Sequence, residues 1–199
     1  MDGEPQRTES EHSEGVVGRE TTGTPASVDR LVEMAYQRHG AYLYRHLVFI
    51  LGDKDEAWDV LQQVFFRFLE FLRQGKSCER TRPFLTRTAT RMAIAHARSW
   101  LWRRRPLDVL PEEALRGDDL TVELVEGVRR AHHRLAPKAR AVLEAMLVER
   151  MSYTEMRDSL GFSASTVKRA IRSIIKELKK YGVDIENFLA PNRGLDASL

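Results

Sequence analysis

The chain has 199 residues, of which 42% are hydrophobic and 31% are charged, and its formal net charge is +3. This length suits one ordinary domain or two small ones, and the apolar share is sufficient for a buried core. The single cysteine, Cys78, excludes an internal disulfide framework. Because the sequence also lacks a secretory signal and an apolar run of about 18 residues, we expect a cytoplasmic protein without membrane insertion.

The first segment, residues 1–27, is rich in Glu, Ser, Thr and Gly and contains almost no large apolar side chains. It cannot bury enough surface to offset its ordering entropy, so the sequence predicts a disordered acidic tail. Two interpretations remain open: a solvated tail, or a tail that masks a basic DNA-binding face. The acids are Asp2, Glu4, Glu9, Glu11, Glu14 and Glu20.

From residue 28 onward the apolar spacing is helical, and no alternating strand pattern persists, which predicts an all-α fold. The clearest helix is expected at 54–74, after a helix that ends at Gly52. Asp53 and Glu56 have capping-box spacing, and Gly75 is the stop signal. The apolar stripe of this helix consists of Ala57, Val60, Leu61, Val64, Phe65, Phe68 and Leu72.

The opposite face of this helix is polar but carries one large apolar side chain, Phe66. Such a residue often marks a contact with a partner, although a single exposed Phe is also common. The other side chains off the apolar stripe are Asp59, Gln62, Gln63, Arg67 and Glu70.

A second long helix is predicted from Pro83 to Arg105. Its cationic stripe comprises Arg87, Arg91, Arg98, Trp102 and Arg105, and Ile94 completes it; no Asp or Glu occurs between Arg87 and Arg105. Cations neutralise phosphates and aromatic rings stack on unpaired bases, so the stripe favours nucleic-acid binding. The alternative is a solvated face with its aromatics in the core. The stripe ends in a cluster formed by Trp100, Trp102, Arg103, Arg104 and Arg105.

Residues 107–120 contain Pro, Gly and several acids and are interpreted as a linker. A second small helical domain is expected at 121–182, and residues 183–199 form a C-terminal tail without clear periodicity. The best local signal is a helix-turn-helix at 152–179. Ser152 and Glu155 have capping-box spacing, Gly161 can end the first helix, and Ser163 can cap the second.

The second helix of this motif has the properties of a helix that reads the major groove. Its inner stripe is Val167, Ile171, Ile174, Ile175 and Leu178, and its outer face is polar and basic. Arg and Lys can donate to guanine, and Ser and Thr can contact bases or phosphates. The alternative is a plain helical hairpin with a solvated charged face. The predicted DNA-binding residues are Ser163, Ser165, Thr166, Lys168, Arg169 and Arg172.

The sequence contains no pattern that indicates catalysis. It has no Gly-rich phosphate loop, no HExxH and no Cys/His metal spacing, and its histidines are scattered. We therefore expect no enzyme, no cofactor and no metal site.

The order of these elements resembles the extracytoplasmic-function (ECF) sigma factors of bacterial RNA polymerase, which consist of two helical domains called regions 2 and 4. The resemblance covers about residues 28–182. The 54–74 helix is similar to the polymerase-binding helix of the family at Ala57, Asp59, Gln62 and Phe65. The 83–105 helix is similar to its promoter −10 segment at Leu85, Ala89, Ile94 and Arg98, but Arg91 and Ala95 replace the usual Asn and Asp.

The region 4 segment resembles the iron-starvation branch of the family most closely. Leu135, Pro137 and Arg140 match its lead-in, and the start of the reading helix matches at Ser163, Ser165, Thr166, Val167 and Lys168. This resemblance implies region 2 at 28–106 and region 4 at 121–182. It implies polymerase contacts at Asp59, Gln62, Gln63, Phe66 and Arg67.

The resemblance implies core RNA polymerase and promoter DNA as partners, and a role in promoter recognition, strand opening and transcription initiation. It allows an anti-sigma factor or a membrane-bound sigma regulator as a further partner. Two other functions stay open: a helix-turn-helix regulator that binds DNA alone, and a decayed sigma relative that binds polymerase without opening promoters. Arg91 and Ala95 keep the second of these open.

Overall fold

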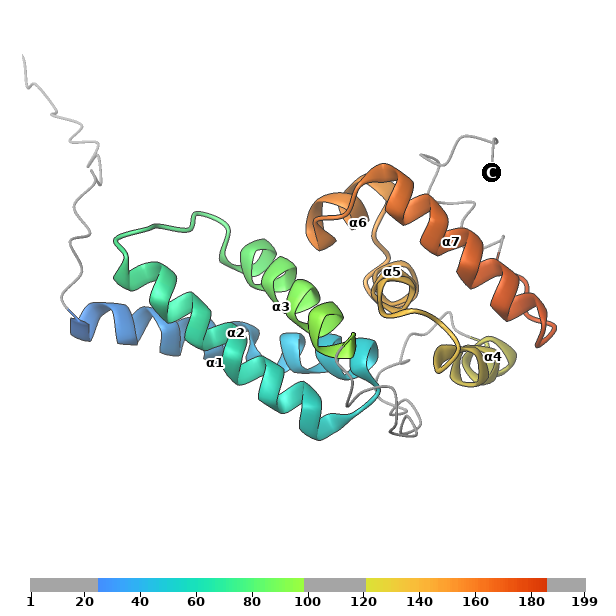
Figure 1. Ribbon diagram of the computed structural model, residues 1–199, viewed down its shortest axis with the longest axis horizontal. Coiled ribbons are helices and arrows are strands. Elements are labelled where there is room, and N and C mark those ends of the chain that lie inside the picture. The colour runs from blue at the N-terminus through green and yellow to red at the C-terminus, as the bar shows by residue number, and fades with distance from the viewer. Residues whose placement is uncertain (1–24, 99–120, 186–199) are drawn as a thin grey trace, which may run out of the picture.

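A computed structural model describes residues 25–98 and 121–185, and over these ranges the chain is all-helical, as predicted (Figure 1). The predicted linker at 107–120 lies outside the described residues, as do Trp100, Trp102, Arg103, Arg104 and Arg105. The helices are α1 (Pro25–Leu51), α2 (Lys54–Arg73), α3 (Thr81–Ala97), α4 (Val122–His132), α5 (Pro137–Leu147), α6 (Tyr153–Leu160) and α7 (Ala164–Lys179).

Helix α2 follows the prediction closely because its ends are encoded locally. The Asp53 side chain accepts hydrogen bonds from the backbone N–H groups of Asp55 and Glu56 at its start. Gly52 and Gly75, with φ of 73° each, lie just outside its two ends. The predicted stripe is buried against α1 and α3 except for Leu72, which is half-buried.

Helix α3 begins earlier than predicted, at Thr81, and its described part ends at Ala97 with Arg98 as the C-cap; the rest of the predicted helix, 99–105, lies outside the described residues. Ile94 was predicted to complete the cationic stripe but is buried. Helix α3 contacts α5 and α6 in addition to α1 and α2, and its exposed side chains are Arg82, Arg87, Arg91 and Ala95.

Three of the last four helices also begin at encoded side-chain caps, whereas α5 begins with Pro137 in its first turn and has no side-chain cap. Thr121 caps α4, and Ser152 and Glu155 form the predicted capping box of α6. Gly161 is left-handed at φ 68°, and Ser163 caps α7. The predicted inner stripe of α7 is buried, with Ile175 half-buried.

The expectation that residues after 182 are an unpatterned tail is corrected by Val183 and Ile185, which are both buried. Val183 packs directly on Gly127 of α4, where an added Cβ would lie 2.2 Å from the Val183 Cγ2 atom. The packed chain therefore extends to Ile185.

Helix α5 is the central element of the molecule. Every residue from Ala139 to Leu147 is buried, as expected for a helix that is covered on all sides. Helix α5 contacts α1 and α3 on one side and α6 and α7 on the other, and Figure 1 shows it between these two groups. The N-terminal unit, α1–α3, and the C-terminal unit, α4–α7, thus meet at α5.

One buried arginine joins the ends of two helices across this junction. Arg140 of α5 is 1% exposed. Its Nη1 donates to the carbonyls of Ile50 at 3.0 Å and Leu51 at 3.4 Å, at the end of α1. Its Nε donates at 3.0 Å to His132 and to Leu135, at and just beyond the end of α4. Carbonyls at helix ends lack partners within the helix, so the Arg140 cation stabilises both helix ends. Burial of the guanidinium lowers the pKa of Arg140 to about 10.

Two buried histidines complete this junction. His46 of α1 pairs through Nδ1 with the carboxylate of Glu144 on α5 and forms a 2.8 Å hydrogen bond with Thr90 of α3. His132 donates from Nε2 to the Phe49 carbonyl at 2.5 Å. Burial, followed by the nearby charges of Arg140 and His133, lowers the pKa of His132 to about 3. We call His46, Thr90, His132, Arg140 and Glu144 the buried polar cluster.

Candidate nucleic-acid and partner interfaces

The outer face of α7 presents the residues predicted to read DNA. Ser165, Arg169 and Arg172 are exposed, and Thr166 and Lys168 are half-buried. Ser163 is also exposed, but its hydroxyl already accepts from the Thr166 backbone N–H. The inner face packs in the core, so this helix can offer cationic and hydroxyl donors to a ligand without disturbing its packing.

The described part of the cationic stripe, Arg87, Arg91 and Arg98, is exposed on α3. Arg87 Nε donates to the Asp158 backbone carbonyl of α6 at 2.7 Å. An added Cβ at Gly161 would lie 3.5 Å from the Arg87 side chain and 3.7 Å from Arg91 Nη2. Arg87 and Arg91 therefore lie against the end of α6 and the turn before α7, which the sequence did not predict.

Arg157 lies in the last turn of α6, just before the Gly161 turn. Its side chain is exposed and pairs with the neighbouring carboxylate of Asp158 at 2.9 Å. This hydrogen bond lowers the pKa of Asp158, and the charge of Arg87 adds to the effect. The Arg157 charge therefore lies at the surface.

Helix α2 presents a second exposed surface. Phe66 is 60% exposed on the polar face, and Asp59, Gln62, Gln63 and Arg67 are exposed with it. Trp58, 46% exposed, packs its ring edge-on against Tyr44 of α1 and was not identified from the sequence. A large apolar group among polar side chains is suited to a protein contact rather than to catalysis.

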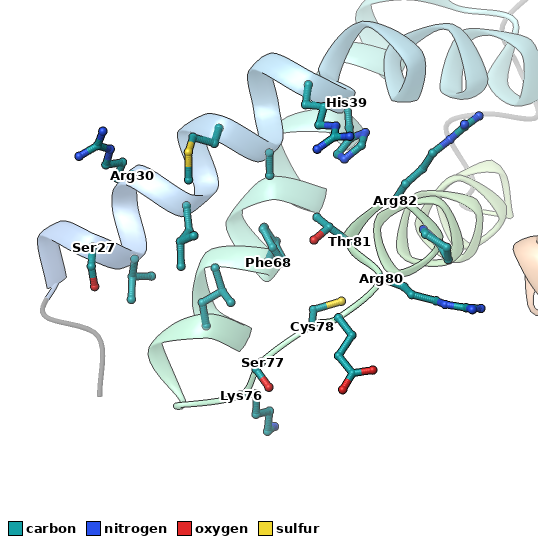
Figure 2. A pocket seen from close by; sticks show the side chains of 18 of the residues that line it. Ser27, Arg30, His39, Phe68, Lys76, Ser77, Cys78, Arg80, Thr81 and Arg82 are labelled. Atoms are coloured by element: carbon teal, nitrogen blue, oxygen red, sulfur yellow. The ribbon is translucent and has the colours of Figure 1, made fainter. Parts of the chain in front are cut away.

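A groove of about 1030 Å³ lies between α1, the C-terminal half of α2 and the 74–80 connection (Figure 2). Phe68 and Leu72 of α2 and Leu31 and Met34 of α1 contribute apolar side chains. No sequence pattern indicated this groove, because it depends on how α1 packs against α2. Cations line it at Arg30, Arg38, Lys76, Arg80 and Arg82.

Within the two described ranges, no cluster of three or more His, Cys, Asp or Glu side chains could hold a metal ion. In the same ranges, no helix has the length and apolar character needed to cross a membrane.

Comparisons with known proteins match most of the chain. It is 27% identical over 167 residues to the ECF RNA polymerase sigma factor SigX of Bacillus subtilis, and the alignment covers 77% of this chain and 84% of SigX. It is 25% identical over 176 residues to the ECF RNA polymerase sigma factor SigL of Mycobacterium tuberculosis, and the alignment covers 81% of this chain and 97% of SigL. No family model matches the chain.

These similarities support, in general terms, the family that the sequence motifs indicated. Both relatives are named ECF RNA polymerase sigma factors, and both are aligned over most of their own length. Nothing in them bears on the iron-starvation branch, which stays a prediction.

Proposed function

We propose that this chain is an RNA polymerase sigma factor of the extracytoplasmic-function type, which binds core polymerase and directs promoter recognition and strand opening. The observation that carries the proposal is the similarity to two ECF sigma factors, which extends over about four fifths of the chain. The exposed surfaces on α2, α3 and α7 supply the separate contacts that this role requires.

The polymerase contact is assigned to the exposed face of α2. Phe66 would enter a pocket of the partner while Asp59, Gln62, Gln63 and Arg67 supply the surrounding polar contacts. Interfaces commonly depend on one central aromatic side chain inside a polar rim. The exposed Phe66 supports this assignment.

The promoter contacts are assigned to two helices. On α7, Arg169 and Arg172 would reach base edges or phosphates, and Ser165, Thr166 and Lys168 would fix the position of the helix. On α3, Arg87, Arg91 and Arg98 would neutralise phosphates near the start site. The aromatic and basic residues that follow, Trp100 and residues 102–105, would stack on and hold the opened strand.

Region 2 would occupy residues 28–106, the linker 107–120, and region 4 residues 121–182, the latter with α6 and α7 as its helix-turn-helix. The motifs at 135–140 and 163–168 favour the iron-starvation branch of the family. An anti-sigma factor or a membrane-bound sigma regulator would then control the protein.

The test combines core binding, DNA binding and RNA synthesis with the purified chain. A sigma factor makes core polymerase initiate at discrete sites. A regulator that acts alone shifts DNA without core, and a decayed relative binds core without producing RNA. Either of the last two results would replace the proposal.

A further inference from the structure

We propose that residues 9–20 of this chain, here called the acidic segment, dock in the groove between α1 and α2. Val16 and Val17 would cover its apolar floor, and the carboxylates would face its cationic rim. The occupant of the groove is then part of the same chain rather than a separate partner. The groove takes no part in the proposed function, so this inference does not depend on that function.

The floor of the groove presents apolar side chains to solvent. Leu31 and Met34 of α1 are 43% and 48% exposed, and they line the groove together with Phe68 and Leu72 of α2. Large apolar groups that gather in one concave surface are typical of a binding site, because an occupant removes their area from water. The floor therefore favours an occupant with apolar side chains.

The rim of the groove is cationic. Five Arg and Lys side chains line the groove against one carboxylate, that of Glu79. Among the residues that the structure describes, no carboxylate forms an ion pair with Arg30 or Arg38, and both are exposed. Burial, followed by the charges of Arg38 and Arg82, lowers the pKa of His39, as expected where positive charges gather. The rim therefore favours an anionic occupant.

The sequence that precedes α1 has the complementary composition. Residues 1–24 contain six carboxylates and two arginines. Val16 and Val17 are adjacent in this stretch, and Glu14 and Glu20 lie on either side of them. An apolar pair between acidic side chains matches an apolar floor inside a cationic rim, both in charge and in the order of the groups.

The point of attachment lets the acidic segment reach the groove. Helix α1 begins at Pro25, and Figure 2 shows Ser27 at one end of the groove and His39 at the other. This part of α1 is about 18 Å long at 1.5 Å per residue. The chain from Val17 to Pro25 spans up to about 27 Å when extended, so Val17 can fold back to any point of the groove.

Attachment to the same chain allows a weak contact to fill the groove. A short flexible linker gives its two ends an effective concentration of about 1 mM. A segment that binds with a Kd of about 0.1 mM as a free peptide would then occupy the groove for about 90% of the time. A separate acidic ligand would have to compete with this occupant.

The first test uses Cys78, the single cysteine, which is half-buried and lines the groove. A docked segment should slow its reaction with a neutral maleimide. Glu11→Lys combined with Glu14→Lys should lower the occupancy from about 90% to about half, so the reaction should become about fivefold faster. Glu123→Lys combined with Glu126→Lys makes the same charge change at exposed positions of α4 and should leave the rate unchanged.

A second pair of variants tests the apolar contact without a change of charge. Val16→Ser combined with Val17→Ser should also speed the reaction severalfold, because the apolar floor loses its cover. Thr21→Ser combined with Thr22→Ser alters the same stretch beside the acidic segment and should react like the parent. Added salt should speed the reaction of the parent, because it screens the charge contacts.

The second test observes the acidic segment itself by NMR of the 15N-labelled full chain. The amide signals of Val16 and Val17 should differ from those of a free peptide of residues 9–20. Arg38→Glu should move both signals toward the peptide positions, because it reverses a charge of the rim. Arg130→Glu makes the same charge change at an exposed position of α4 and should not move them.

Three results would overturn the proposal. The Val16 and Val17 signals of the parent could coincide with those of the free peptide, or Cys78 could react equally fast in the parent and in the Glu11→Lys, Glu14→Lys chain. Protection of Cys78 that increases with protein concentration would assign the groove to a second copy of the chain. Neither test uses polymerase or promoter DNA, so these results are separate from failure of the proposed function.

Discussion

Replacement of Arg140 tests whether its buried guanidinium stabilises the fold through its hydrogen bonds to the ends of α1 and α4. In Arg140→Ala, carbonyls at the ends of α1 and α4 lose their buried donor. Each buried group left unsatisfied costs about 1–3 kcal/mol, and because such costs are not additive we expect a total loss of about 3–5 kcal/mol. Denaturant unfolding followed by circular dichroism measures this loss, and the melting temperature should fall by about 10 °C or more.

Two further variants make the Arg140 prediction refutable. Arg140→Lys keeps the charge, but all of its N–H donors lie on one nitrogen and cannot span both helix ends, so it should recover only part of the stability. Arg130→Ala removes an exposed arginine that pairs with Glu126 and should cost less than about 1 kcal/mol. Equal unfolding midpoints for Arg140→Ala and Arg130→Ala would refute the role of the guanidinium.

Four further substitutions test the proposed polymerase contact, the two proposed DNA contacts and the role of buried His132. Phe66→Ala should weaken core binding by about 2 kcal/mol without changing the circular dichroism, and an unchanged pull-down affinity would remove Phe66 from the contact. Arg169→Ala should cost roughly 1–3 kcal/mol on the preferred sequence if it contacts a base edge; no loss on either specific or random DNA would exclude it. Trp102→Ala should leave the closed complex intact but reduce strand opening, with rescue on a premelted bubble template; normal permanganate reactivity on duplex DNA would assign the ring to packing. Burial and the charge of Arg140 lower the pKa of His132 from 6.5 to about 3. The contribution of neutral His132 to the free energy of unfolding should therefore be fully present above pH 6.5 and should fall by up to about 1.4 kcal/mol per pH unit between pH 6.5 and about 3. If the free energy of unfolding of the parent and of His132→Gln fell equally with pH over this range, the prediction would be wrong.

The sequence predicted best those features that are encoded within a few residues. The bounds of α2 follow from Asp53 and Gly75, and the capping box of α6 from Ser152 and Glu155, because each cap uses a neighbouring side chain or backbone conformation. The exposure of Phe66 followed from helical periodicity alone.

The junction of the two units could not be predicted in this way. His46 and Glu144 are separated by 98 residues, so no local pattern connects them. Arg140 was recognised only as part of a family motif, although the apolar stretch around it indicates a helix that is covered on all sides. Ile94 was predicted to lie on the cationic stripe, because helical periodicity does not show that helices distant in the sequence pack against α3. Burial of Val183 could not be predicted from periodicity, because Val183 lies outside a helix and packs on Gly127 of α4.

The most direct test of the sigma assignment is in vitro transcription with core polymerase and sheared genomic DNA, followed by sequencing of RNA 5′ ends. Core alone and core with the Phe66→Ala chain serve as controls. The assignment predicts discrete 5′ ends that require the parent chain and share an upstream sequence, with fewer such transcripts from the Phe66→Ala chain. It would be contradicted if core with the parent chain produced no transcripts beyond those of core alone, while the same chain still bound core or DNA.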